Sequence, residues 1–221
     1  MTLEEFRKNA KEIEDWAPGW EAIDKCLEAL YHGQKPRHFA SLMTDRAIFG
    51  GFHFLDGFSV FNSEHGHLHI ITYGMSELYA VEESLGGEWS KWGYEMTIRL
   101  PVCEEADYMW AIDLLANLAR YNFKTNQIFA PGQFFSSKGI PIKEKSNSKL
   151  TGLLIVEDPE LPGADTLYGR LDFLQIVGIT QAESDALLKA DDENYWLMLA
   201  EKMRKNNPYY ITDLDRIADY V

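Results

Sequence analysis

The sequence predicts an α+β fold in which helices pack against a central, mostly antiparallel β-sheet. Near both ends of the chain and in its middle, apolar residues recur every three or four positions, as they do along one face of a helix. Between residues 37 and 100 they recur at every second position instead, which is the period of a strand with one buried face. Gly-rich turns separate these strands, which indicates antiparallel pairing.

Two helices are expected at the start of the chain. Thr2 and Glu5 have the spacing of a capping box, and the first helix should run from there to about Asp15, before the stop signal Pro18-Gly19. A second helix should follow and end near His32-Gly33. The buried face of this second helix would carry Trp20, Ile23, Leu27 and Leu30.

The sheet should be built mainly from the region that follows these helices. Its clearest strand covers residues 92–100, where apolar residues alternate with Glu95, Thr97 and Arg99, so one face of this strand should be buried. Weaker strands are expected at residues 37–42, 58–61 and 68–73, with turns at the glycine pairs 50–51 and 86–87.

A third helix is expected over residues 105–123, where the helical period returns. Residues 132–149 are rich in Ser, Lys, Gly and Asn and predict an exposed, mobile loop. Two further strands should follow at residues 150–156 and 171–177, with a turn at residues 157–160 between them.

The C-terminal part should again be helical. Thr180 and Glu183 form a second capping box, which predicts the start of a fourth helix. A last helix would carry Tyr195, Trp196, Leu199 and Met203 on one face. The tail over residues 208–221 is expected to contain a short strand.

The composition indicates one globular domain over residues 1–221, since 46% of the residues are hydrophobic and 25% are charged. The longest apolar runs fall short of the roughly 20 residues that cross a bilayer, and no signal-peptide pattern opens the sequence. Two cysteines, Cys26 and Cys103, give no disulfide framework. We therefore expect a cytoplasmic protein outside the membrane.

The chain is strongly acidic, with 35 Asp and Glu against 21 Lys and Arg and a formal net charge of −14. Phosphate backbones and anionic lipid surfaces are repelled by such a charge, so neither nucleic acid nor a membrane is an expected partner. The charge serves solubility in any case, and it would also favour a basic protein partner.

No familiar catalytic or cofactor motif stands in the sequence. The Gly-rich loops that bind dinucleotides or nucleoside triphosphates are absent, and no serine lies in the Gly-x-Ser-x-Gly pattern of hydrolases. The expectation is a protein that is not an enzyme and that needs no cofactor.

Three histidines at alternate positions, His65, His67 and His69, are the sharpest local pattern. Alternate residues on a strand point the same way, so these imidazoles could share a metal ion, with His53 or Glu64 as a further ligand. The competing interpretation places His67 and His69 on a half-buried strand, with His65 in the preceding turn and the ring nitrogens satisfied within the fold. We favour this second interpretation, and the metal site remains a weak candidate.

The candidate partner-binding residues are Tyr79 and the acidic residues Glu82, Glu83 and Glu88 that follow it. Tyrosines near strand ends make good interface anchors, because they bury a large area at low entropic cost and keep a polar tip. The alternative is a tyrosine that serves only the core or its rim.

The segment His67-Leu-His-Ile-Ile-Thr-Tyr-Gly-Met-Ser-Glu-Leu-Tyr79 resembles the signature of the suppressor of fused family. Other segments resemble blocks of the same family in the same order, over nearly the whole chain. They are Pro18-Gly-Trp-Glu-Ala-Ile-Asp24, Gly93-Tyr-Glu-Met-Thr-Ile-Arg-Leu100, Asn117-Leu-Ala-Arg-Tyr121, Glu157-Asp-Pro159, Phe173-Leu-Gln-Ile-Val-Gly178 and Ile211-Thr-Asp213.

The resemblance implies an α/β sandwich without known enzymatic activity. Animal members of the family restrain Gli-type transcription factors by clamping a short peptide strand, and bacterial members are thought to include immunity proteins against polymorphic toxins. Of the site residues, the resemblance carries over only Tyr79. The chain resembles the N-terminal lobe of the animal protein, and we expect a bacterial-type member without the second lobe.

Three hypotheses about function follow. The first is a module that binds and neutralises a protein partner, such as a basic toxin domain, and the second is a regulator that sequesters an intracellular factor through an exposed strand edge. The third, a distant alternative, is a metal-dependent enzyme built on His65, His67 and His69.

Overall fold

The structure, a computed structural model, describes residues 1–40 and 54–221. In these residues five α-helices and eight strands follow one another as α1 (Leu3–Glu12), α2 (Pro18–Tyr31), β1 (Arg37–Ala40), β2 (Gly57–Asn62), β3 (His67–Tyr73), β4 (Trp89–Pro101), α3 (Glu105–Thr125), β5 (Phe134–Ser136), β6 (Leu150–Glu157), β7 (Ala164–Thr166), β8 (Gly169–Thr180), α4 (Gln181–Lys189) and α5 (Tyr195–Asn206). A 3-10 turn, η3 (Glu82–Ser84), precedes β4.

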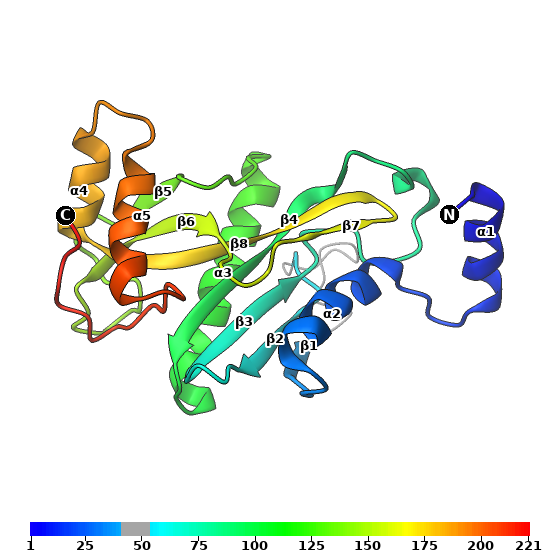
Figure 1. Cartoon of the computed structure of the whole chain (residues 1–221), viewed down its shortest axis with the longest axis horizontal. Coiled ribbons are helices and arrows are strands. Elements are labelled where there is room, and N and C mark those ends of the chain that lie inside the picture. Colours follow the sequence, from blue (N-terminus) through cyan, green and yellow to red (C-terminus); the bar gives the residue numbers. More distant parts are fainter. Residues whose placement is uncertain (41–53) are drawn as a thin grey trace.

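All eight strands belong to one sheet, in the order β1-β2-β3-β4-β8-β6-β5, with β7 paired to β8 as a hairpin (Figure 1). The central pair β4 and β8 is parallel and the other pairs are antiparallel, which confirms the predicted α+β fold with a mixed, mostly antiparallel sheet. Beyond Trp89, β4 loses its regular register with β8, and pairing resumes at Tyr94.

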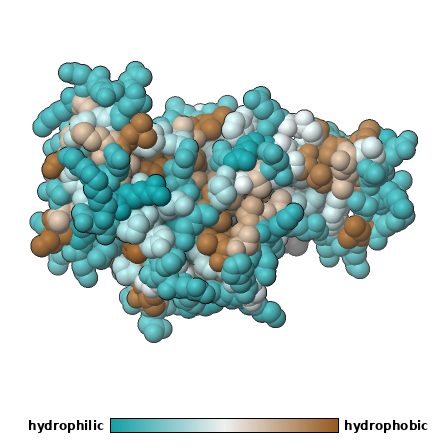
Figure 2. Space-filling view, in the orientation of Figure 1, coloured by the Kyte–Doolittle hydropathy of each residue, from teal (hydrophilic) through white to brown (hydrophobic). Residues whose placement is uncertain are grey.

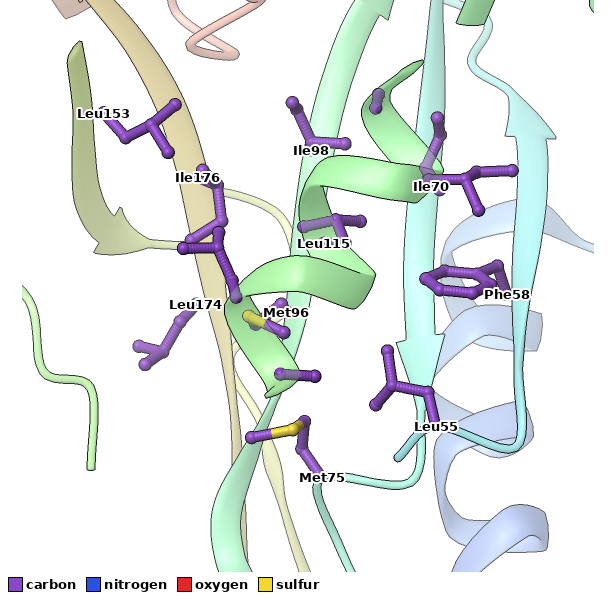
Figure 3. Close-up of a cluster of buried hydrophobic side chains, with 14 of the residues drawn as sticks. Leu55, Phe58, Ile70, Met75, Met96, Ile98, Leu115, Leu153, Leu174 and Ile176 are labelled. Carbon is purple, nitrogen blue, oxygen red and sulfur yellow. The ribbon is translucent and has the colours of Figure 1, made fainter. Parts of the chain in front are cut away.

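One face of the sheet packs against α3 and forms the main core. Leu115 of α3 lies over Met96 and Ile98 of β4, and the neighbouring strands add apolar side chains such as Ile70 and Ile176 (Figure 3). This burial explains the helical period of residues 105–123 and the alternation of residues 92–100, because each pattern places its apolar residues on the surface shared by helix and strand.

The opposite face is divided between two smaller cores. At one end α2 covers Phe61, Ile71 and Phe173, and at the other α4 and α5 cover Val156 and Val177. Figure 1 shows α2 and α5 on the same side of the sheet, with strands visible between them. In the strip between the two cores the strands carry polar side chains: His67, His69, Thr97, Arg99 and Gln175.

Most of the predicted elements are present, and the differences have local causes. The first helix ends at Glu12 and not near Asp15, because Ile13 is already extended and Asp15 has a positive φ of 52°. The predicted loop 132–149 contains β5, which pairs with β6, and β7 was missed because its three residues carry no period. The predicted strand of the C-terminal tail is wrong, since residues 208–221 form turns and irregular backbone.

The strand β4 is buried on both faces, which corrects the prediction that only one face would be. Glu95, Thr97 and Arg99 alternate with the apolar residues as expected, yet none of the three is exposed. The predicted positions 41–42, the glycine pair 50–51 and His53 lie outside the described residues. The face in Figure 2 is mostly hydrophilic, with hydrophobic residues at several separate places.

Candidate functional site

The turn that leads to Tyr79 is held in place by the buried carboxylate of Glu95. This carboxylate accepts hydrogen bonds from the hydroxyls of Thr72 and Ser76 at 2.6 and 2.7 Å, and from the backbone N–H groups of Gly74 and Ser76 at 3.0 and 2.9 Å. Burial raises the pKa of Glu95, and these hydrogen bonds act against that rise. The polar side of β4 therefore anchors the backbone of the turn.

The first turn of α2 packs directly against the same segment. The backbone N–H groups of Gly19 and Trp20 donate to the carbonyl of Leu78 at 3.0 and 3.3 Å. A Cβ atom at Gly19 would lie 1.7 Å from the carbonyl oxygen of Glu77, so this close approach requires glycine. Helix and turn together fix the position from which Tyr79 projects.

Tyr79 lies at the surface, where its side chain is 40% exposed. Its hydroxyl donates to Asp56 at 2.7 Å, and its carbonyl accepts a hydrogen bond from the hydroxyl of Tyr168 in the β7–β8 hairpin. Tyr79 is thus partly exposed, while its hydroxyl and its backbone are fixed by the fold.

The three candidate acidic residues differ in their surroundings. Glu82 forms a bidentate ion pair with Arg7 of α1, with N–O distances of 2.7 and 2.6 Å, whereas Glu83 and Glu88 are exposed. The arginine lowers the pKa of Glu82. Beside Glu88, Trp89 opens β4 with half of its surface exposed.

Helix α1 supports this end of the molecule. Phe6, Trp16 and Tyr168 form a small separate core. The ring centroid of Phe6 lies 5.1 Å from that of Trp16 and 6.4 Å from that of Tyr168. Figure 1 shows α1 at the far end of the molecule, beyond the β7–β8 hairpin. The segment from Tyr79 to Trp89, which we call the acidic edge, is therefore backed by α1 and the hairpin.

The candidate histidines lie elsewhere, in the polar strip between α2 and α5. His69 is fully buried and has a partner at each ring nitrogen: the hydroxyl of Tyr31 at 2.7 Å from Nδ1, and Oδ2 of Asp158 at 3.1 Å from Nε2. The carboxylate of Asp158 can only accept, so the proton of the neutral His69 lies on Nε2 and the hydroxyl of Tyr31, whose pKa is raised by burial, donates to Nδ1.

Asp158 is the centre of this strip. Its carboxylate accepts two hydrogen bonds from the guanidinium of Arg99, at 2.8 and 2.9 Å, and one from the hydroxyl of Thr97 at 2.7 Å. Arg99 also donates to Gln175 and, at 3.0 Å, to Glu160. A buried arginine and a buried aspartate thus form a hydrogen-bonded ion pair, the arrangement in which buried charges are tolerated.

The protonation states in the strip follow from these contacts. Burial alone would raise the pKa of Asp158, but the interactions with His69 and Arg99 outweigh it and hold that pKa well below its usual range. Burial and the nearby Arg99 lower the pKa of His69 to about 4 and that of His67 to about 3. Both imidazoles are therefore neutral at pH 7.

His65 and His67 lie beside Glu160 without a close ion pair, since the Nε2 atoms of both histidines are 3.9 Å from its carboxylate. The ring of His65 stacks on Tyr209 with centroids 4.5 Å apart. Within the described residues both ring nitrogens of the buried His67 lack a hydrogen-bond partner, so the expectation that the fold would satisfy them on a half-buried strand is wrong for His67. Among residues 1–40 and 54–221, no group of three His, Cys, Asp or Glu side chains is placed to hold a metal ion.

The alternation of His65, His67 and His69 thus brings the imidazoles to one region, but the cation of Arg99 shares it. A positive charge there disfavours a second cation. Sequence reasoning missed Arg99, Asp158, Glu160 and the exposed Trp89. An arginine inside the clearest strand was the one available signal, because a buried arginine requires an acidic partner.

None of the helices in the described residues has the length and hydrophobicity needed to span a bilayer.

A family model described as suppressor of fused protein matches residues 53–217. The human suppressor of fused homolog is 32% identical to this chain over 156 residues, which are 68% of this chain and 32% of the human protein. The chain therefore spans about a third of the length of the curated relatives that it matches.

Two solved structures share the fold over 92% of this chain. The first, from a crystal structure of a Sufu–Fu complex, has 27% sequence identity and a TM-score of 0.78, and 92% of its own chain is covered. The second is a suppressor of fused homolog from Neisseria gonorrhoeae, with 20% identity, a TM-score of 0.61 and 97% of its chain covered. At that lower identity the likeness shows the fold alone.

Proposed function

Because the chain belongs to the suppressor of fused family, we propose that it is a non-enzymatic module that binds a protein partner through the acidic edge. One observation carries this proposal. A relative of matching extent, covered over 92% of its length, comes from a complex of Sufu with Fu. This supports the view that a chain of this size, with this fold, is sufficient for binding a protein.

The acidic edge has the features of a small protein interface. Tyr79 and Trp89 are large, partly exposed aromatic residues, the kind that contributes most binding energy in interfaces. Glu83 and Glu88 add exposed negative charge beside them, in a chain whose net charge is −14. Glu82 contributes less, because Arg7 already pairs with it. A basic partner would associate faster with this surface, and high salt would slow that association.

The partner that fits this chemistry is a basic protein, and we favour a toxin domain that the module neutralises. The alternative is a regulator that sequesters an intracellular factor. Among the described strands, β1 lies at one edge of the sheet beside β2, and such a factor could add a strand there. The genes beside the coding sequence separate the two: a toxin gene supports the first, and an unrelated gene supports the second.

The proposal is tested by affinity capture from the native cells at low salt, followed by expression of the captured protein. Tyr79→Arg and the double variant Glu83→Lys/Glu88→Lys should each weaken binding at least tenfold. Tyr79→Phe is the matched control, since it keeps the ring and removes the hydroxyl that donates to Asp56.

A second control is Glu14→Lys, which reverses one negative charge, half the change of the double variant, at an exposed position outside the acidic edge. If a purified partner binds the Arg and Lys variants as tightly as the original chain, with the fold intact by circular dichroism, the acidic edge is not the interface. The metal-dependent alternative is tested separately by elemental analysis of protein purified without a His tag. Stoichiometric Zn, Ni or Fe would favour that alternative.

A further inference from the structure

A groove of about 1160 Å³ lies between α5 and the segment 157–162, and we call it the α5 groove. Its α5 wall includes Leu197 and Met198, which are 50% and 43% exposed, together with Trp196. Pro159 and Pro162 line the other wall. This volume lies above the roughly 300–1,000 Å³ of most small-molecule pockets, and the groove is open, so a chain segment suits it better than a compact ligand.

Helix α5 has exposed apolar residues besides the buried ones that pack it against the sheet. Leu199, Ala200 and Met203 are the buried residues of α5 and belong to the core over β6 and β8. Leu197 and Met198 do not belong to that core and line the groove, together with Ala200. A single exposed leucine would be ordinary, but two adjacent large apolar residues that line a groove indicate an interaction surface.

The opposite wall is rigid, because the buried ion pair of Asp158 and Arg99 fixes it. Oδ1 of Asp158 also accepts hydrogen bonds from the backbone N–H groups of Glu160 and Leu161, at 2.9 and 3.0 Å. The segment is thus tied to β4 through Arg99 and to its own backbone through the same carboxylate. A groove with a preformed wall binds a segment at a lower entropic cost than a groove that must first be ordered.

The charges on the rim favour a cationic occupant. Glu157 and Glu201 are exposed and Glu160 is half-buried, whereas Arg204 is the one cation that lines the groove in the part of the chain that the structure describes. Glu160 is partly neutralised by Arg99, so Glu157 and Glu201 are the exposed negative charges among the lining residues. Apolar walls with an acidic rim complement a segment in which apolar residues alternate with Lys or Arg.

From these observations we infer that the α5 groove binds a basic, apolar peptide segment of the protein partner. The inference rests on the proposed protein-binding function and adds a second contact site to it. Figure 1 places α5 at the opposite end of the molecule from α1, which backs the acidic edge. A partner that engaged both sites would gain affinity from their simultaneous occupation.

The test selects peptides directly on the purified chain, from a phage-displayed library of random 12-residue peptides. Enriched peptides should combine aliphatic or aromatic residues with Lys or Arg, and synthetic copies should bind with micromolar Kd values in fluorescence polarisation. Leu197→Asp and Glu201→Lys should each weaken this binding at least tenfold. Leu188→Asp is the matched control, since Leu188 is exposed on α4 and does not line the groove.

Three results would overturn the inference. The first is a library that yields no enriched peptide. The second is a set of enriched peptides that bind the Leu197 and Glu201 variants as tightly as the original chain. The third is self-association of the chain that Leu197→Asp abolishes, because the occupant of the groove would then be a second copy. The groove peptides should also bind the Tyr79→Arg variant normally. Failure of the α5 groove therefore leaves capture of a partner through the acidic edge untouched, and the two proposals can fail separately.

Discussion

Replacing Asp158 by asparagine should remove a large part of the stability of this protein. Asparagine keeps the shape of the side chain but loses the charge, so Arg99, which is fully buried, is left with Glu160 as its remaining carboxylate partner. Breaking a buried ion pair by removing one member costs about 3–5 kcal/mol. For a chain of this length each kcal/mol lowers Tm by roughly 2–4 °C, so the expected fall is about 6–20 °C.

Urea denaturation followed by circular dichroism measures this loss. The matched control is Asp165→Asn, which also removes a carboxylate beside an arginine, but at a position whose side chain is 91% exposed and 3.9 Å from Arg170. Exposed ion pairs contribute about 0–1 kcal/mol, so Asp165→Asn should lower the free energy of unfolding by at most about 1 kcal/mol. If Asp158→Asn costs no more than Asp165→Asn, the strip is not held by its central ion pair.

Three further predictions concern the same regions. His67→Phe should leave stability at pH 7 unchanged or higher, because the ring nitrogens of His67 have no hydrogen-bond partners in the part of the chain that the structure describes. It should also flatten the acid side of the stability curve. With a folded pKa of about 3 and an unfolded pKa near 6.5, His67 opposes folding by about 2 kcal/mol at pH 5, and urea titrations at pH 5 and 7 would show whether that loss disappears. Gly19→Ala should destabilise the protein by about 1–3 kcal/mol, because the new methyl group would clash with the carbonyl of Glu77. This loss should outweigh the better helix propensity of alanine. Urea titrations measure it, and a gain in stability would contradict the close approach of α2 to Glu77. Thr180→Ala should cost about 1–2 kcal/mol, since Thr180 caps α4 and its hydroxyl donates to Asp219 at 2.6 Å. Thermal melts measure this loss, and an unchanged Tm would show that the cap does not stabilise the protein.

The elements that the sequence predicted well are those whose signals are local. The capping boxes at Thr2 and Thr180 form as predicted, because a cap involves residues only three positions apart. The helix α3 and the strand β4 were found from their periods, since each places its apolar residues on the one face that packs into the main core. The short strands β5 and β7 were missed, because three residues are stabilised by their neighbours in the sheet and carry no period of their own.

The candidate sites were predicted less completely. Tyr79 was singled out from its segment, but its anchoring by Glu95 and by the first turn of α2 depends on contacts across the sheet. The alternation of His67 and His69 correctly indicated one shared side of a strand. The partners on that side could not be found from spacing, because Asp158 is 89 positions away from His69 in the chain.

The sequence by itself determined the five helices and the longer strands, the acidic character of the chain and the resemblance to a family. These properties depend on near neighbours or on composition, so they do not require the fold to be known. The tertiary structure decided that both faces of β4 are buried, that Arg99 meets Asp158, and that α5 and the segment 157–162 form a groove. The order of strands β3, β4 and β8 brings these distant residues together, because pairing across a sheet is set by the burial of all its strands at once.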